Sequence, residues 1–307
     1  MKVTAQEITQ ELLGKLWEQY LERVSYAKKY AGLVIEKGGK VVHDHIAFGT
    51  FNIHTGEQPG GIMAIQHLIE ILGYQPVGKY VFPKRKLNAI HFEYPGEMFP
   101  KIFVSQLEVV QLPGWAQQMI GETVSDTPYL LSDNGLSLLQ LLRETGSLTR
   151  EAARLLVDEL AGYLRRTLNI PLKKYVLEIN DVSPYAAWVL LHGNSVYHFA
   201  ALVNEQGVDE WPDLETTCEA LKQEGIPMKE TIEGEKEGKL RQSATMAVKE
   251  DVEVRGEDGP EPITWTYAYY EFTQRGFTEE NGIQKLFSGF LNEQDRHLFD
   301  MTKTRDN

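Results

Sequence analysis

Three side chains in this sequence combine metal-binding chemistry with surroundings in which a polar group is unusual. His45 lies in a segment rich in β-branched and aromatic residues, His198 lies in an apolar run, and Glu271 directly follows Tyr267-Ala268-Tyr269-Tyr270. Burying an unpaired carboxylate carries a free-energy penalty large enough to unfold a marginal protein. Glu271 must therefore lie at an edge, pair with a cation or bind a metal.

Each of the three side chains also has a simpler explanation. His198 can be a hydrogen-bonded core histidine. Glu271 can pair with Arg275, because alternate residues of a strand share a face. The same alternation places His43 and His45 on one face, with both rings toward a metal or one of them beyond the edge of the core. Residue chemistry alone leaves these alternatives open.

Taken together, His45, His198 and Glu271 would form the two-histidine, one-carboxylate set that suits non-haem iron(II). Such a set holds iron on one face and leaves the remaining positions for a substrate and dioxygen. Zinc would accept the same ligands. The three residues lie far apart in the chain, so their spacing does not decide between these metals.

Other candidate ligands are weaker. His54, His67 and His297 are expected at the surface, because nothing near them in the sequence completes a site. Cys218 is the only cysteine, so neither an internal disulfide nor a thiolate-rich metal site can form.

Composition and charge exclude several classes of protein. The chain has 307 residues, of which 42% are hydrophobic and 24% charged, as in ordinary globular proteins. The net charge of -13 argues against a nucleic-acid-binding surface, which needs a basic stripe, but not against a small anionic substrate. The N-terminal segment lacks a basic start and an apolar run, and no stretch has the ~20 apolar residues of a membrane helix. We expect a cytoplasmic protein without nucleic-acid or membrane partners.

The elements that must position these side chains begin with a helix. Thr4 and Glu7 have the spacing of a capping box, and apolar residues then recur at helical intervals. The residues from 40 to 51 predict a strand, those from 62 to 73 a helix, and those at 87–94 and 101–110 two further strands. This order is the shape of a βαβββ unit, whose last strand the pattern does not locate.

The middle of the chain is predicted to be helical, and β patterns return after it. Strands are expected at 195–203, 244–254 and 263–273, with a helix through Leu214 and Leu221. The charged stretch at 230–239 indicates a solvated loop or a hairpin edge. Strand–helix–strand order on both sides of the helical middle hints at a repeated module. We expect one α+β domain over residues 1–307 with a helical insertion at about 134–192.

Six short segments carry a resemblance to one enzyme family. The segment Asp44-His45-Ile46-Ala47-Phe48-Gly49-Thr50-Phe51 resembles the first block of the 2-oxoadipate dioxygenase/decarboxylase-like family, which is related to the vicinal-oxygen-chelate fold. Five later segments resemble the following blocks in family order, namely 82–87, 100–107, 194–200, 241–245 and 270–275. Each match is short, and the ordered set over roughly residues 40 to 290 is what makes it specific.

The resemblance implies a fold, a metal site and a reaction. It implies a bent antiparallel sheet of vicinal-oxygen-chelate type that encloses a metal, with helices packed outside. It implies that His45, His198 and Glu271 bind Fe(II), with His43 as a neighbour. The substrate would be a 2-oxo acid such as 2-oxoadipate, which reacts with dioxygen to give 2-hydroxyglutarate and carbon dioxide.

One position departs from the family pattern. The family usually has an arginine four residues after its first histidine, where it binds the substrate carboxylate, and this chain has Gly49. Glycine cannot replace a bidentate arginine–carboxylate contact. Another cation must take over that role, or the substrate differs; the candidate cations are Arg275, Arg85 and Lys84.

The candidate pocket residues outside the metal set are Arg275, Gln242 and Ser243, with Thr245 beside them. These residues either line the substrate pocket or belong to a strand edge. Two other functions stay open at this point. One is a glyoxalase-like lyase or isomerase that uses zinc, nickel or manganese, and the other is a non-catalytic protein that binds a small ligand on the same scaffold.

Overall fold

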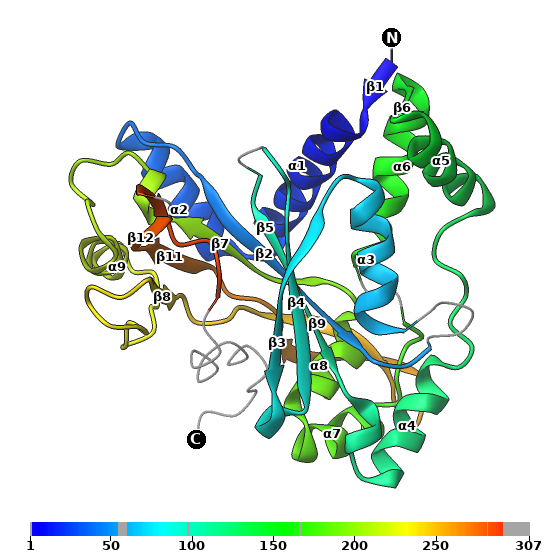
Figure 1. The fold of residues 1–307 in the computed structure, drawn as a ribbon. Coiled ribbons are helices and arrows are strands. Elements are labelled where there is room, and N and C mark those ends of the chain that lie inside the picture. Colours follow the sequence, from blue (N-terminus) through cyan, green and yellow to red (C-terminus); the bar gives the residue numbers. More distant parts are fainter. Residues whose placement is uncertain (1, 55–59, 97–98, 166–167, 281, 291–307) are drawn as a thin grey trace.

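The candidate ligands lie on a curved seven-stranded sheet that runs through the middle of the molecule in the computed structural model (Figure 1). The structure describes residues 2–54, 60–96, 99–165, 168–280 and 282–290. The strand order is β3-β4-β5-β2-β7-β11-β8, so β2 and β7 lie side by side at its centre. The strands are β2 His43–Phe51, β3 Gln75–Phe82, β4 Leu87–Glu93, β5 Lys101–Leu107, β7 Val196–Leu202, β8 Leu240–Ala244 and β11 Glu271–Arg275.

The sheet is mixed rather than antiparallel throughout. β5 is parallel to β2, and β11 is parallel to β7, whereas the other neighbouring strands are antiparallel. The predicted α+β class with a bent sheet is confirmed, and its description as antiparallel is corrected. In each half, a helix connects the first strand to the edge of the sheet. The last strand of that half then lies beside the first strand and parallel to it.

The two halves of the sheet repeat one arrangement. In the first half, β2 is followed by helix α3 (Gly61–Ile71) and by β3, β4 and β5, which is the predicted βαβββ unit. In the second half, β7 is followed by helix α9 (Leu214–Gln223) and then by an edge segment, residues 228–233. Two isolated bridges, Met228–Thr245 and Glu233–Gln242, join this edge segment to the chain at β8, and β8 and β11 follow. The hint of a repeated module is thus confirmed. Strand β3 was not predicted, because it is a largely exposed edge strand with a proline and a glycine.

Two N-terminal helices cover the face of the sheet opposite the candidate ligands. They are α1 (Ala5–Arg23) and α2 (Ser25–Glu36). Aromatic side chains of these helices pack on the sheet residues that alternate with the ligands: Trp17 on Phe199 at 5.0 Å between ring centroids, and Tyr30 on Phe272, also at 5.0 Å. This packing fixes which face of β7 and β11 is left for chemistry.

The predicted capping box at the start of α1 is present. The Glu7 backbone N–H donates to Thr4 Oγ1 at 3.2 Å, and the Thr4 backbone N–H donates to Glu7 Oε2 at 2.8 Å. These two bonds satisfy donors that the first turn of a helix leaves free.

The middle of the chain is helical, as predicted, apart from the short strand β6 (Ser147–Thr149), which pairs with β1 (Lys2–Thr4). Its helices are α4 Gly114–Val124, α5 Asp133–Thr145, α6 Arg150–Tyr163, α7 Lys173–Val182 and α8 Pro184–His192. Helix α8 is buried from Tyr185 to His192 and packs on β2. The division of residues 134–192 into an insertion stays a prediction. Within the described residues, none of the helices has the length and apolar character needed to cross a bilayer.

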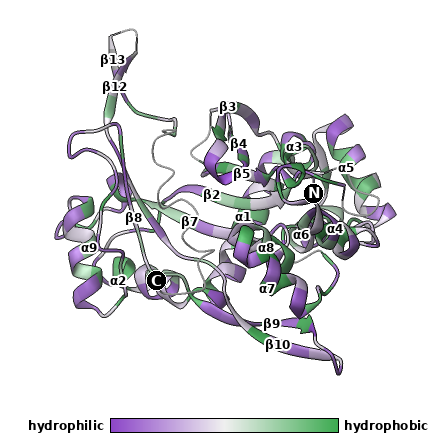
Figure 2. Cartoon of the chain, turned by 90° about the horizontal axis from the view of Figure 1, so that it is seen from below, coloured by the Kyte–Doolittle hydropathy of each residue, from purple (hydrophilic) through white to green (hydrophobic). Residues whose placement is uncertain are grey.

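Two predicted strands are each split in two. The expected strand at 244–254 is β8 followed by β9 (Lys249–Arg255), and the expected strand at 263–273 is β10 (Pro260–Thr266) followed by β11. β9 and β10 pair with each other and form a hairpin that extends from the main sheet, as does the hairpin of β12 (Phe277–Glu280) and β13 (Ile283–Leu286) (Figure 2). Alternation continues across each break, so the pattern alone did not reveal where the chain leaves the sheet.

A β-bulge at Asp44 reverses one sequence expectation. His43 pairs with Ala201 and His45 pairs with Ala200, so Asp44 is an extra residue between consecutive pairs. The His43 ring consequently packs on Trp17 at 4.4 Å between centroids, on the α1 side, while His45 faces His198. The prediction that His43 and His45 share a face is therefore wrong.

The partly buried position of His43 generates a prediction about stability. Burial lowers its pKa from 6.5 to about 4. The unfolded chain therefore binds a proton on His43 more readily than the folded protein does. The contribution of neutral His43 to the free energy of unfolding is present above about pH 6.5 and is lost as the pH falls toward 4. His43→Phe should reduce the loss of unfolding free energy between about pH 7 and about pH 5 by on the order of 1 kcal/mol, measured by urea unfolding.

His67→Phe is the matched control, because His67 is exposed on α3. This variant should keep the pH dependence of the wild type. If His43→Phe also kept it, titration of the His43 ring would not be its source.

Candidate metal centre

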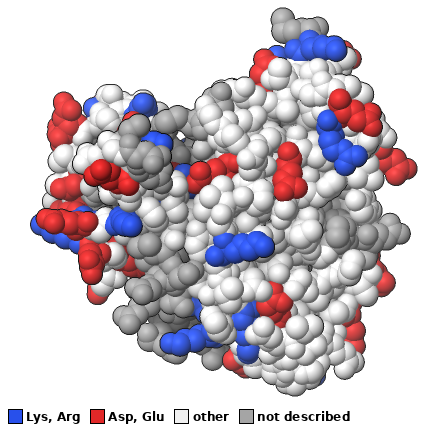
Figure 3. All heavy atoms as spheres, in the orientation of Figure 1, with Lys and Arg blue, Asp and Glu red and all other residues white. Residues whose placement is uncertain are grey.

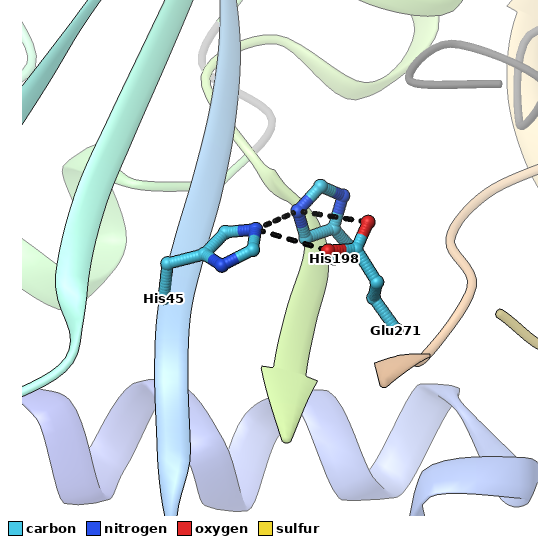
Figure 4. A group of neighbouring side chains, drawn as sticks. All are labelled: His45, His198 and Glu271. Atoms are coloured by element: carbon cyan, nitrogen blue, oxygen red, sulfur yellow. Dashed lines mark hydrogen bonds and ion pairs between the residues drawn. The ribbon is translucent and has the colours of Figure 1, made fainter. Parts of the chain in front are cut away.

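Three buried side chains from separate strands converge on one point of the sheet. His45 of β2, His198 of β7 and Glu271 of β11 point toward one another (Figure 4), and one ligand atom from each lies within 4.8 Å of the others. His45 Nε2 lies 2.8 Å from His198 Nε2 and 3.4 Å from Glu271 Oε1, and His198 Nε2 lies 3.9 Å from Glu271 Oε2. The side chains that the sequence singled out are thus brought together.

The bulge residue Asp44 orients His45. Asp44 Oδ2 lies 2.8 Å from His45 Nδ1, which places the ring proton on Nδ1 and turns the Nε2 lone pair toward the other two ligands. Arg275 donates from Nη2 to the same carboxylate at 2.8 Å. Burial would raise the pKa of Asp44, but the guanidinium outweighs it and holds that pKa far below its ordinary value. Asp44 is therefore ionised and fixes the tautomer of His45.

Two polar neighbours hold the Glu271 carboxylate. Gln242 Nε2 donates to Glu271 Oε1 at 2.5 Å, and Thr273 Oγ1 donates to the same oxygen at 3.1 Å. The other oxygen, Oε2, is the one nearer to His198. Burial raises the pKa of Glu271 above its ordinary value. A carboxylate in this position keeps its charge most easily when a cation joins it.

The donor set fits a divalent metal ion. Burial, followed by the close approach of the His45 ring, lowers the pKa of His198 well below its ordinary value, so this ring is neutral at neutral pH. Two imidazole nitrogens that face each other, together with a carboxylate oxygen, are the ligands of iron(II) and zinc sites. The geometry therefore fits the metal alternative better than that of a core histidine beside a salt bridge.

Aromatic side chains enclose the group. Phe290 packs edge-on against His45 at 4.9 Å between ring centroids and also contacts Phe103 at 5.1 Å. Its backbone N–H donates to the Tyr80 hydroxyl at 3.2 Å. His91, a buried histidine that no sequence pattern singled out, lies beside the same phenylalanine at 5.3 Å between ring centroids. These rings keep water away from the ligands on this side.

Arg275 does not pair with Glu271. Its guanidinium binds the Asp44 carboxylate through Nε and Nη2, and its Nη1 donates to the backbone carbonyls of Phe287 at 2.8 Å and Gly289 at 2.9 Å. The bulge turns Asp44 toward this strand, which strand alternation could not predict. Arg275 therefore acts on His45 through Asp44, and its guanidinium is already engaged.

Ser243 and the two candidate cations Lys84 and Arg85 lie away from the ligands. Ser243 pairs with Phe272, on the opposite face from Glu271, so its expected place in the pocket is corrected. Lys84 and Arg85 lie between β3 and β4, next to the residue pair Leu87–Leu107. Leu107 is six residues along β5 from Lys101, which pairs with His45. At about 3.3 Å per residue, that is roughly 20 Å away.

The structure explains why position 49 is glycine in this chain. A Cβ atom on Gly49 would lie 2.8 Å from the Tyr185 hydroxyl and 3.2 Å from a ring carbon of Trp188. Both residues belong to α8. Tyr185 in turn donates to the Ser105 carbonyl at 3.0 Å. The space in which an arginine side chain would start is thus filled by a buried helix.

Comparison with known protein families gives one match across most of the chain. A family model described as 2-oxoadipate dioxygenase/decarboxylase matches residues 12–307. An Arabidopsis thaliana protein named "2-oxoadipate dioxygenase/decarboxylase, chloroplastic" is 25% identical over 291 residues, which is 89% of this chain and 70% of that protein. A rice relative with the corresponding name is 26% identical over 198 residues, which is 61% of this chain and 47% of that protein.

Solved structures share the fold. A Ralstonia eutropha protein assigned to the glyoxalase superfamily superposes with a TM-score of 0.85 at 24% identity, covering 94% of this chain and 87% of that one. The hydroxyglutarate synthase from Oryza sativa, solved in complex with 2-oxoadipate, superposes with a TM-score of 0.75 at 20% identity, covering 97% of this chain and 93% of that one. The vicinal-oxygen-chelate type of fold is thereby confirmed.

Orientation of His45 by Asp44 predicts a loss of metal affinity in Asp44→Asn. The neutral amide no longer favours the tautomer with the proton on Nδ1, so affinity for ferrous or zinc ion should fall by about 10- to 100-fold in a chelator competition. Asp258→Asn makes the same chemical change in the exposed turn between β9 and β10 and should leave affinity unchanged. Equal affinities in Asp44→Asn and the wild type would contradict the orienting role.

Close packing around Gly49 predicts the effect of a methyl group there. Gly49→Ala should lower the free energy of unfolding by about 1–3 kcal/mol, because the buried contact with Tyr185 must give way. In a Tyr185→Phe background the loss should be smaller, since the closest atom is removed. Gly14→Ala is the control: this exposed position in α1 has no atom within 4 Å of the added carbon, and the change should stabilise by about 1 kcal/mol. A destabilisation independent of Tyr185 would refute the steric explanation.

Proposed function

The chain belongs to the 2-oxoadipate dioxygenase/decarboxylase family, and from that premise we propose that it is an iron(II)-dependent enzyme that converts 2-oxoadipate to 2-hydroxyglutarate and carbon dioxide. The observation that carries the proposal is the buried group of His45, His198 and Glu271 on three neighbouring strands. Family membership supports the dioxygenase and decarboxylase activity. The metal, the product and the residue roles are the proposed part.

His45, His198 and Glu271 would hold the iron. When bound, ferrous iron supplies the redox chemistry with dioxygen and the positions at which a 2-oxo acid binds through its keto oxygen and carboxylate. The residues of the chain supply binding, orientation and exclusion of water.

The polar neighbours of His45 and Glu271 keep these two ligands in place through the reaction. Asp44 holds the proton on His45 Nδ1, so His45 Nε2 stays a lone-pair donor. Gln242 and Thr273 bind the same oxygen of Glu271 and fix the rotation of its carboxylate. Arg275 anchors Asp44 and, through the carbonyls of Phe287 and Gly289, the backbone that carries Phe290 over His45.

The proposed reaction needs no external reductant. The bond between the carboxylate and the keto carbon of 2-oxoadipate breaks and releases carbon dioxide. The former keto carbon becomes a carboxylate with one atom of dioxygen, and the next carbon is hydroxylated with the other. Both electron pairs needed to reduce dioxygen come from the substrate itself, through cleavage of that carbon–carbon bond and oxidation of a C–H bond.

The proposal predicts oxygen-dependent turnover. Protein loaded with ferrous iron should consume dioxygen and release carbon dioxide from 2-oxoadipate without any second substrate, and 2-hydroxyglutarate should appear in equal amount by mass spectrometry. His198→Ala should lose both metal and turnover, because one of three ligands is gone. Turnover that persists without dioxygen, or that requires zinc, nickel or manganese, would point to a glyoxalase-like lyase or isomerase instead.

A panel of 2-oxo acids completes the test. Iron-loaded protein that releases no carbon dioxide from any of them would overturn the proposed reaction. Retention of metal by His198→Ala would instead favour a non-catalytic ligand-binding protein. The plant relatives carry the word "chloroplastic" in their names, so the cytoplasmic location expected for this chain stays a prediction.

A further inference from the structure

We propose that Lys229, on the edge segment beside β8, binds the distal carboxylate of a dicarboxylic 2-oxo acid whose other end lies at His45, His198 and Glu271. This inference rests on the proposed function, since it names where the far end of that substrate binds. The sequence did not single out Lys229, which directly precedes the charged stretch at 230–239, and that stretch indicated only a loop or a hairpin edge.

The edge segment places Lys229 in line with Glu271. Met228 bridges to Thr245, and the Lys229 backbone N–H donates to the Ala244 carbonyl at 2.9 Å. Ala244 is in turn the register partner of Glu271. Residues that lie opposite each other on neighbouring strands point to the same face of a sheet. The Lys229 side chain therefore starts on the face that carries the candidate ligands.

The ammonium group lies close to the metal centre. Lys229 Nζ is 4.8 Å from the centroid of the Tyr269 ring, and that ring is 5.0 Å from the His198 ring, so the ammonium is within about 10 Å of His198. A six-carbon chain such as that of 2-oxoadipate is roughly 6 Å long between its end carbons. A substrate held at one end by a metal on His198 can thus reach Lys229 with the other.

Two positive groups lie where the two ends of a dianion would bind. Asp44 and Arg275 form a buried pair and cancel. A divalent ion on Glu271 leaves one positive charge at one end, and Lys229 carries the second, with Glu233 of the same edge segment as a competing negative charge.

A local cation matters here because the protein as a whole repels anions. The net charge is -13, and on the face drawn in Figure 3 acidic and basic side chains of the described residues are interspersed rather than gathered into a basic patch. Attraction of a dicarboxylate must therefore come from groups inside the site. A half-buried lysine is well suited, since charge interactions weaken less there than at the surface.

Glu233 is the neighbouring negative group that must be considered. It bridges to Gln242 on the same edge segment, and its charge raises the pKa of Tyr269, after burial and the charges of Glu271 and Tyr197. A bound carboxylate would be repelled by Glu233. Glu233→Gln should therefore leave dicarboxylate binding unchanged or strengthen it, whereas a change at Lys229 should weaken it.

The test compares two ligands of equal length under anoxic conditions. Isothermal titration calorimetry on iron-loaded protein would give Kd for 2-oxoadipate and for 2-oxohexanoate, which lacks the distal carboxylate. Lys229→Met should raise Kd for 2-oxoadipate by about 10- to 100-fold and change that for 2-oxohexanoate by less than about threefold. Lys229→Arg should restore most of the difference between the ligands. Lys222→Met, the same change on the exposed side of α9, should have no effect.

The possible outcomes separate the two proposals. If Lys229→Met weakens both ligands equally, or neither, the assignment of Lys229 is overturned, whatever the turnover of the wild type. If the wild type binds 2-oxoadipate selectively through Lys229 but releases no carbon dioxide in air, the binding site stands and the proposed reaction fails. A wild type that does not distinguish the two ligands also overturns the assignment.

Discussion

Burial of the Glu271 carboxylate is the constraint on which the rest of the site depends. The carboxylate lies on β11 between the buried aromatic residues Tyr270 and Phe272, and burial raises its pKa. The cation nearest to it along the strand, Arg275, is bound to Asp44 instead. That division has a chemical consequence: Arg275 keeps Asp44 ionised, Asp44 fixes His45, and Glu271 is left as an anionic ligand. A metal ion between the histidines and Glu271 would offset the burial that the fold imposes.

The internal repeat of the sheet explains why three protein ligands meet at this point. Across the central strands, His45, Ala200 and Glu271 form one row of register partners. The equivalent row from the other half is His198, Ala47 and Phe103. Phe103 thus occupies the position that mirrors Glu271. A phenylalanine there cannot bind a metal, so the repeat supplies two histidines but only one carboxylate, and part of the coordination sphere is left to other ligands.

The residue types of the site could be predicted from the sequence, but their connections could not. An imidazole or a carboxylate inside an aromatic strand is visible as an anomaly, and periodicity located most of the helices and strands that carry it. The bulge at Asp44 was not visible, because an extra residue leaves no mark on composition, and it reversed the side on which His43 lies. The pairing of Asp44 with Arg275 joins residues 231 positions apart. Lys229 was hidden for a different reason: its edge segment has the composition of a loop, and only bridges to β8 align it with Glu271.

The exclusion of water connects these features to selectivity. Phe290 covers His45 on one side and is itself backed by Phe103, and Tyr185 and Trp188 fill the sheet face beside Gly49. In such an enclosed space, charge interactions are stronger than at the surface, and an unpaired charge is also more unfavourable. A substrate with one carboxylate would lack the proposed contact with the Lys229 ammonium group. The same enclosure that gives Glu271 a need for a metal therefore gives the site a preference for a second carboxylate.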